Sequence, residues 1–162
     1  MNIWKRIRQL SVGQLWKLTM LFVVNPFKII PTLRATQRTF YICNKLYGKE
    51  HHKSNKANAF RHALWNALIC KNIRKKSKNK QKTVFWAQKV TDLYENVTKN
   101  NELDEAMDLH NNAIGRISFL NFLDKKEEEL VGFLQNKSKN ARKIQNLEEI
   151  ESTTNQMVYL HD

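Results

Sequence analysis

The chain contains very little proline and glycine. Its 162 residues include two Pro and four Gly, and both prolines, Pro26 and Pro31, lie near the start. Proline and glycine interrupt helices more than other residues do, so their scarcity leaves long segments free to form helices. We find no strand-like alternation, no internal repeat and no linker between domains. The sequence therefore predicts an all-α fold, a single compact domain of five to seven helices.

Cysteine is also scarce, and common catalytic motifs are absent. Cys43 and Cys70 are the only cysteines, and neither belongs to a C-x-x-C pair or a zinc-finger spacing. Both lie in apolar helical segments, so we expect buried thiols, no disulfide partner and a reducing, cytoplasmic location. The chain lacks the G-x-S-x-G, P-loop, H-E-x-x-H and dinucleotide-binding motifs. No cofactor or metal is therefore assigned.

Acidic residues are nearly missing from the first part of the chain. Residues 1–100 hold 21 Lys or Arg against 3 Asp or Glu, a net charge of +18, whereas residues 101–162 hold 7 against 12, a net charge of −5. Such a basic part can bind nucleic acid or an anionic membrane surface, or it can simply be a solvated surface. The densest basic run, residues 71–82, lacks interleaved aromatic residues. Nucleic-acid binding is therefore only weakly supported.

Residues 1–24 predict an amphipathic N-terminal helix. Lys5, Arg6 and Arg8 lie upstream of a largely apolar run from Leu18 to Val24, which is far shorter than the ~20 residues that span a bilayer. No small-residue cleavage site follows the run, so it is not a typical signal peptide. The helix either packs on the domain or binds an anionic membrane surface, with Trp4 and Trp16 at headgroup level. The second alternative places the protein peripherally on the inner membrane.

The rest of the chain divides into helical patterns separated by polar loops. We expect a helical core domain over residues 25–135, which carries the polar site, and a C-terminal helix and tail over residues 136–162. The final residues, 152–162, read as a loose tail. The predicted helices span about 32–47, 57–74, 82–98, 102–122, 125–135 and 139–151. Gly48 is expected to end the first of them, Ser54 or Asn55 to cap the second, and His51 and His52 to lie on the surface.

Two of these helices carry polar side chains where a core helix should be apolar. Residues three and four apart lie on one face of a helix, so the polar residues of 57–74 form one strip and those of 102–122 form another. An unpaired buried polar group costs about 1–3 kcal/mol, so the strips should face each other, with His62 opposite Asp108. Glu95 lies on the helix between them. The strips contain Asn58, Arg61, Trp65, Asn66, Asn111, Asn112 and Arg116 as expected substrate-binding residues.

Two readings of this buried polar set remain open. In the first, the protein is a hydrolase with His62 as general base or metal ligand, while Glu95 or Asp108 orients it or holds a cation. Arg61, Asn111 and Asn112 would then bind an anionic, phosphate-bearing substrate. In the second, the strips are structural networks of a non-enzymatic module that binds a membrane surface or nucleic acid. If Asp108 is structural, its side chain should face a single hydrogen-bond donor. If Asp108 belongs to a functional site, its side chain should instead open to a cavity.

The pattern Asn58-Ala-Phe-Arg61-His62-Ala-Leu-Trp65-Asn66, followed by Met107-Asp108 and by Asn111-Asn112-Ala-Ile-Gly115-Arg116, resembles a bacterial domain family without an assigned activity. The resemblance covers about residues 25–120. Members of that family are small free-standing proteins or the C-terminal tips of secreted repeat proteins of the polymorphic-toxin kind. Similar sequences carry Ala-His-Glu in the middle helix, where this chain has Leu93-Tyr94-Glu95. The resemblance implies that a phenol here replaces a histidine.

A second resemblance, to the Arg-His-Asp helix of bacterial phospholipases A2, rests on Arg61-His62 alone. The aspartate that binds calcium in those enzymes corresponds to Ala63 here. This difference argues against their mechanism and leaves only the expectation of a helical, lipase-like site.

Overall fold

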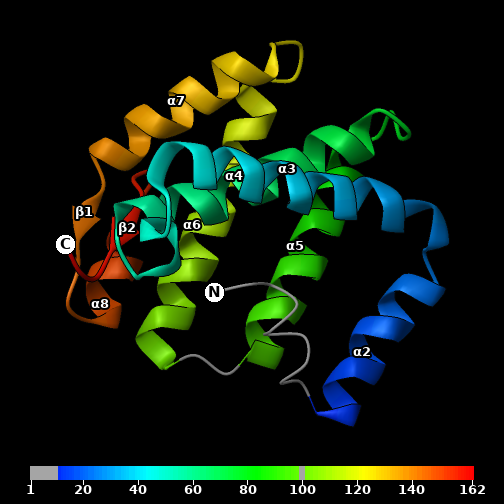
Figure 1. Ribbon diagram of the computed structural model, residues 1–162, viewed down its shortest axis with the longest axis horizontal. Helices are drawn as coiled ribbons and strands as arrows, with labels where there is room; N and C mark the ends of the chain where they lie inside the picture. The colour runs from blue at the N-terminus through cyan, green and yellow to red at the C-terminus, as the bar shows by residue number, and fades with distance from the viewer. Residues whose placement is uncertain (1–10, 99–100) are drawn as a thin grey trace.

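The computed structural model describes residues 11–98 and 101–162 (Figure 1). These residues form seven α-helices, two 3-10 turns and two short strands, so the predicted all-α class is confirmed. Most of the predicted helices are recovered with small shifts at their ends, but the helix predicted over 139–151 is not. In chain order the elements are α2 (Val12–Val23), η1 (Pro26–Lys28), α3 (Ile29–Tyr47), η2 (Glu50–His52), α4 (Lys56–Arg74), α5 (Lys80–Thr98), α6 (Glu102–Asn121), α7 (Glu127–Lys139), β1 (Arg142–Lys143), α8 (Leu147–Glu151) and β2 (Val158–Tyr159).

Helix α4 lies at the centre of the fold. Every residue from Ala57 to Cys70 is buried, because α3, α5, α6 and α7 all pack against this helix (Figure 1). The helix begins where the side chain of Asn55 accepts hydrogen bonds from the backbone N–H groups of Ala57 and Asn58, as the sequence predicts. Since α4 has no exposed side over this stretch, its polar residues must bond to neighbouring helices.

Helix α6 crosses α4 at Gly115 with almost no space between the two backbones. A Cβ atom at Gly115 would lie 2.1 Å from the carbonyl oxygen of Ala63, so only glycine permits this crossing. Asn112 lies one turn and Asp108 two turns earlier on α6. The close crossing therefore brings them against α4 at the level of His62.

The C-terminal segment is part of the fold, and the prediction of a loose tail is wrong. Strand β1 pairs in parallel with β2, with Arg142 opposite Val158 and Lys143 opposite Tyr159. Helix α8 occupies only the end of the segment predicted to be helical over 139–151. Met157 is buried in the main core, and Val158 is buried in a smaller apolar cluster with Met107. The last residues thus complete the packing around α4 and α6.

His51 is buried, not exposed as the polar composition of its loop suggested. Its Nε2 donates a hydrogen bond to Asn44 Oδ1 over 2.8 Å, and its ring stacks on His52 and touches the edge of Phe40. Burial, together with the neighbouring His52 and Arg61, lowers the pKa of His51 to about 3. Gly48, with a positive φ of 56°, makes the reversal that folds this loop back onto α3. His51 is therefore a neutral core residue.

Helix α2 corresponds to the part of the predicted amphipathic helix that the structure describes; residues 1–10 lie outside it. One face of α2 packs on the domain, because Leu21 is buried and the ring of Phe22 meets the edge of Trp86 on α5. Among the described residues, no single helix is long and apolar enough to cross a bilayer. Only the pair formed by α2 and residues 26–47, bent by 96°, meets that test, on length and composition alone.

Candidate functional site

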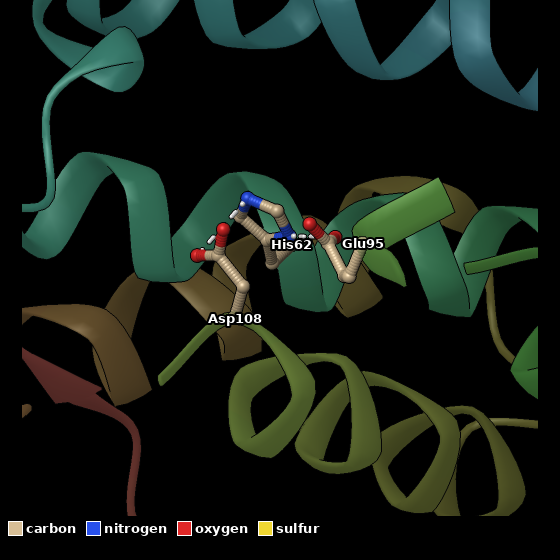
Figure 2. A group of neighbouring side chains, drawn as sticks. All are labelled: His62, Glu95 and Asp108. Carbon is tan, nitrogen blue, oxygen red and sulfur yellow. Dashed lines mark ion pairs between the residues drawn. The ribbon is translucent and has the colours of Figure 1, made fainter. Parts of the chain in front are cut away.

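Three ionisable side chains from three helices meet beside the crossing of α4 and α6. His62 of α4 lies between Glu95 of α5 and Asp108 of α6 (Figure 2). The Nδ1 atom of His62 is 3.4 Å from Glu95 Oε1, and its Nε2 atom is 3.2 Å from Asp108 Oδ1. All three residues are buried. The imidazole therefore has one carboxyl group at each ring nitrogen, and the predicted convergence of His62 with Asp108 is confirmed.

The neighbours of His62 indicate which ring nitrogen carries the proton. Arg61 Nη2 is a donor in hydrogen-bond contact with Nε2, whereas the carbonyl oxygen of the Asn112 side chain lies 3.3 Å from Nδ1. A donor at Nε2, and acceptors from Asn112 and Glu95 at Nδ1, fit a neutral imidazole with its proton on Nδ1. The lone pair on Nε2 then points toward Arg61 and Asp108.

The buried carboxyl group of Asp108 holds a proton more readily than an ordinary aspartate does. Burial raises the pKa of its carboxyl group to about 6 from the ordinary 3.8; electrostatic interaction with His62 and Arg61 partly offsets that rise, and Glu95 and Asp104 add to it. A carboxyl group with such a pKa is protonated in about half of the molecules at pH 6 and in roughly a tenth of them at pH 7. With Asp108 Oδ1 3.2 Å from His62 Nε2, a proton can pass between the two side chains.

A second layer of polar side chains orients the cluster. The amide of Asn66 donates to Asn112 Oδ1 over 2.6 Å, and Asn66 Oδ1 accepts from Arg116 and from the hydroxyl of Thr91 over 3.0 and 3.2 Å. The amide of Asn112 in turn donates to Glu95 over 3.4 Å. These bonds fix both amides, so the acceptor face of Asn112 stays aimed at His62 Nδ1.

Three other predicted binding residues have partners at the edge of the cluster or outside it. Asn111 bonds both ways with the backbone of Val158, donating over 2.8 Å and accepting over 3.0 Å. The indole of Trp65 donates to Thr36 of α3 over 2.9 Å and meets the ring of Tyr94 edge-on. Asn58 accepts from Arg61 over 3.2 Å, at the edge of the cluster. Asn111 and Trp65 thus connect α6 and α4 to other parts of the fold.

The sequence and these contacts can be set against known proteins. Residues 19–142, most of the chain, match the family described as Domain of unknown function (DUF6973). The chain belongs to the DUF6973 family. No curated protein and no solved structure matches it. The matched DUF6973 region includes every residue of the His62 cluster but ends before β2 and its contact with Asn111.

Sequence reasoning missed two contributors to the site of this DUF6973 chain. Thr91 lies one turn before Glu95 on α5 and is completely buried; that spacing was the available signal, although a lone threonine on a helix is commonplace. The backbone carbonyl of His51 accepts from Arg61 Nη1 over 2.7 Å and holds the guanidinium in place. No residue type in the sequence marks a backbone partner of this kind.

His62, Glu95 and Asp108 together offer one nitrogen and two carboxylate oxygens, all within 4.8 Å of one another. This donor set is chemically suitable for a divalent cation, but its arrangement is not. Each carboxyl group faces a different ring nitrogen, and the positive guanidinium of Arg61 occupies the Nε2 side. The DUF6973 site in this chain therefore fits proton transfer better than metal binding.

Proposed function

We propose that this DUF6973 domain is a hydrolase of anionic, phosphate-bearing and lipid-like substrates, with His62 as its general base. The observation that carries the proposal is the placement of the His62 imidazole between two carboxyl groups from separate helices. Buried clusters with a shifted pKa are costly and occur preferentially at functional sites. A general base also needs a fixed tautomer, which Asn112 and Glu95 favour at Nδ1.

The proposed reaction uses the two ends of the imidazole differently. His62 Nε2 takes a proton from a water molecule, whose oxygen forms a bond to the phosphorus of the ester as the bond to the leaving oxygen breaks. Glu95, beside Nδ1, stabilises the imidazolium that results. Asp108, with its pKa raised to about 6, supplies a proton to the leaving oxygen and then recovers one from His62. Protons and charge thus balance within this trio.

Arginine side chains provide the expected anion-binding groups. Arg61 lies against Nε2, where the water would react, and Arg116 is held next to the amide layer by Asn66. A guanidinium is a planar fork of hydrogen-bond donors, so it can bind two phosphate oxygens at once. Arg61 also covers the reactive nitrogen, so the substrate must displace its guanidinium from Asn58 and from the backbone carbonyl of His51 before water can enter.

The experiment is an assay of the full chain on three probes: p-nitrophenyl phosphate, bis(p-nitrophenyl) phosphate and phosphatidylglycerol vesicles. We expect hydrolysis of at least one of them, and His62→Gln should lower kcat by about 10²–10⁴-fold, as removal of a general base typically does. His110→Gln is the matched control, because His110 lies on α6 but bonds to the backbone of Gln156. Hydrolysis of none of the probes, or equal rates for both variants, would contradict the proposal.

The second candidate, a non-enzymatic module with structural polar strips, is favoured by the burial of the cluster. Asn66 and Asn112 are completely buried and bonded to each other, as expected of a core network. Under this reading, variants of His62 and Asn112 lose stability and there is no activity to lose. Measuring the melting temperature of each variant beside its rate separates the two candidates.

A further inference from the structure

A row of apolar side chains lies exposed along α2 and the bend that follows it. Val12, Trp16, Met20 and Val23 recur at intervals of four, four and three residues, so they share one face of α2. Phe27 and Ile30 continue the row into η1 and the start of α3. Trp16 is 64% exposed, Val23 63% and Phe27 83%. We call these six residues the apolar row; its four members on α2 lie outside the face that carries the packed Leu21.

So many large exposed apolar side chains in succession indicate a binding surface. Monomeric proteins seldom expose contiguous apolar patches, and those that exist are often functional. Helix α2 already packs on the domain through Leu21 and Phe22, so the apolar row is additional to what the fold itself needs. The sequence alone suggested packing or membrane binding as alternatives; the structure has one face of α2 packed and leaves the opposite face available.

The charges around the apolar row decide the type of partner. Residues 11–49 contain six Lys or Arg and no Asp or Glu. Lys28, on η1, lies over the ring of Trp86. The pKa of Lys28 is lowered, mainly by burial and further by the positive charges of Lys89 and Lys82 on α5, so the three lysines lie near one another. Exposed apolar side chains next to basic ones match the interfacial region of an anionic bilayer. A second copy docked through the same face would bring like charges together.

We propose that the apolar row and the neighbouring lysines dock this protein on an anionic lipid surface. Helix α2 has 12 residues and is therefore about 18 Å long, too short to cross a hydrocarbon core of about 30 Å. It lies in the plane of the interface, with Trp16 and Phe27 among the headgroups and upper acyl chains. Lys28, Lys82 and Lys89 contact the lipid phosphates. This docking does not depend on the proposed hydrolase activity.

The test is co-sedimentation of the full chain with phosphatidylcholine vesicles that contain phosphatidylglycerol, and with vesicles of phosphatidylcholine alone. We expect binding to the anionic vesicles that weakens with salt, and little binding to the neutral ones. The variant Trp16→Ser, Val23→Ser, Phe27→Ser should lose at least about a hundredfold in affinity, because each of these side chains would bury its apolar area in lipid. The matched control is Ile117→Ser, Leu120→Ser, which removes exposed apolar residues of α6.

The electrostatic part is tested separately with Lys82→Gln, Lys89→Gln. We expect a loss of about fivefold for each charge removed, the equivalent of about 1 kcal/mol. Lys45→Gln, Lys49→Gln, at the other end of α3, should change affinity by less than about twofold, since a Debye length of about 10 Å screens distant charges. In the intact protein, brominated phosphatidylglycerol should quench tryptophan fluorescence, and Trp16→Phe should reduce that quenching.

Three outcomes would overturn the proposal. The first is equal binding to anionic and neutral vesicles, or to neither. The second is unchanged affinity in the serine variant while circular dichroism shows that it is folded. The third is a dimer in sedimentation equilibrium that Trp16→Ser dissociates, because the apolar row would then be covered by a second copy of the chain.

Discussion

Gly115 of α6 and Ala63 of α4 touch through their backbones, and this contact positions the polar cluster. A Cβ atom at Gly115 would lie 2.1 Å from the carbonyl oxygen of Ala63 and 2.7 Å from its Cα atom. Ala63 immediately follows His62, and Gly115 lies two turns after Asp108. The distance between these two helices therefore controls whether His62 and Asp108 stay within 3.2 Å of each other.

Gly115→Ala should destabilise the fold strongly, because the added methyl group meets rigid backbone and α6 must move away. We expect a loss of about 2–4 kcal/mol in the free energy of unfolding, on the scale of core overpacking. Gly132→Ala is the control, since a Cβ atom there meets nothing within 4 Å on α7. That change should stabilise the protein by about 0.5–1 kcal/mol through helix propensity. Urea denaturation measures both; equal effects would refute the backbone contact.

Asp108→Asn should change the pH dependence of stability. Burial raises the pKa of Asp108 to about 6 from 3.8, with Glu95 and Asp104 adding to the rise and His62 and Arg61 opposing it. A raised pKa means that the folded state binds the proton more tightly. The stabilising contribution is therefore complete below about pH 4 and is lost as the pH rises through about 6. Asparagine stays neutral at every pH and does not show this loss.

The melting temperature of Asp108→Asn relative to the wild type should consequently rise from about pH 4 to about pH 6 and level off above that. Differential scanning calorimetry at several pH values gives this difference directly. Asp124→Asn, an exposed change after α6, serves as the control and should show a flat difference. A difference for Asp108→Asn that falls with pH would mean that its carboxylate is stabilised by its neighbours and not held protonated.

Asn111→Ala should release the C-terminal segment from α6. The Asn111 side chain makes two hydrogen bonds to the backbone of Val158, and both groups are buried. Leaving a buried backbone group unpaired costs about 1–3 kcal/mol. Hydrogen exchange should therefore speed up at the amides of residues 158–160 well before the amides of α4 change. Asn121→Ala, an exposed change on the same helix, should leave these rates as they are.

Divalent cations should have little effect on this protein if proton transfer is the chemistry of the site. A cation bound only to the folded state raises stability by about 2.7 kcal/mol at a hundred times its Kd. We expect no such shift in melting temperature with Zn²⁺, Mn²⁺ or Mg²⁺, because Arg61 occupies the Nε2 side of His62. A rise that His62→Gln abolishes would show instead that His62, Glu95 and Asp108 rearrange around a metal.

The helices and the core of the site were predictable because they depend on spacing along single helices. His62 and Asn66 on α4, and Asp108 and Asn112 on α6, are four residues apart in each pair, so their shared faces follow from helical geometry alone. Polar groups on a helix without an exposed side need hydrogen-bond partners on neighbouring helices. This requirement predicted that the polar strips of α4 and α6 face each other. Asn55 as a cap and Gly48 as a terminator followed from equally local rules.

The features that were not predictable depend on contacts between distant segments. His51 looks exposed in its loop of polar residues, and only the packing of α3 and α4 around it decides otherwise. Strand β2 has two residues, too few to show an alternating pattern. The run from Met157 to Leu160 is apolar, and that was the available signal that the tail enters the core. Whether Asn111 binds a substrate or a backbone cannot be read from its position in a helix.

The bond between Asn111 and Val158 also constrains how the protein is made. The two residues are 47 positions apart, so at about 5–20 residues per second a ribosome needs roughly 2–9 s to reach Val158 after Asn111. Until then the side-chain amide of Asn111 on α6 lacks its hydrogen-bond partner, and the main core lacks Met157. During that interval the nascent chain exposes apolar surface that a chaperone can hold, and the domain closes only after translation of its last residues.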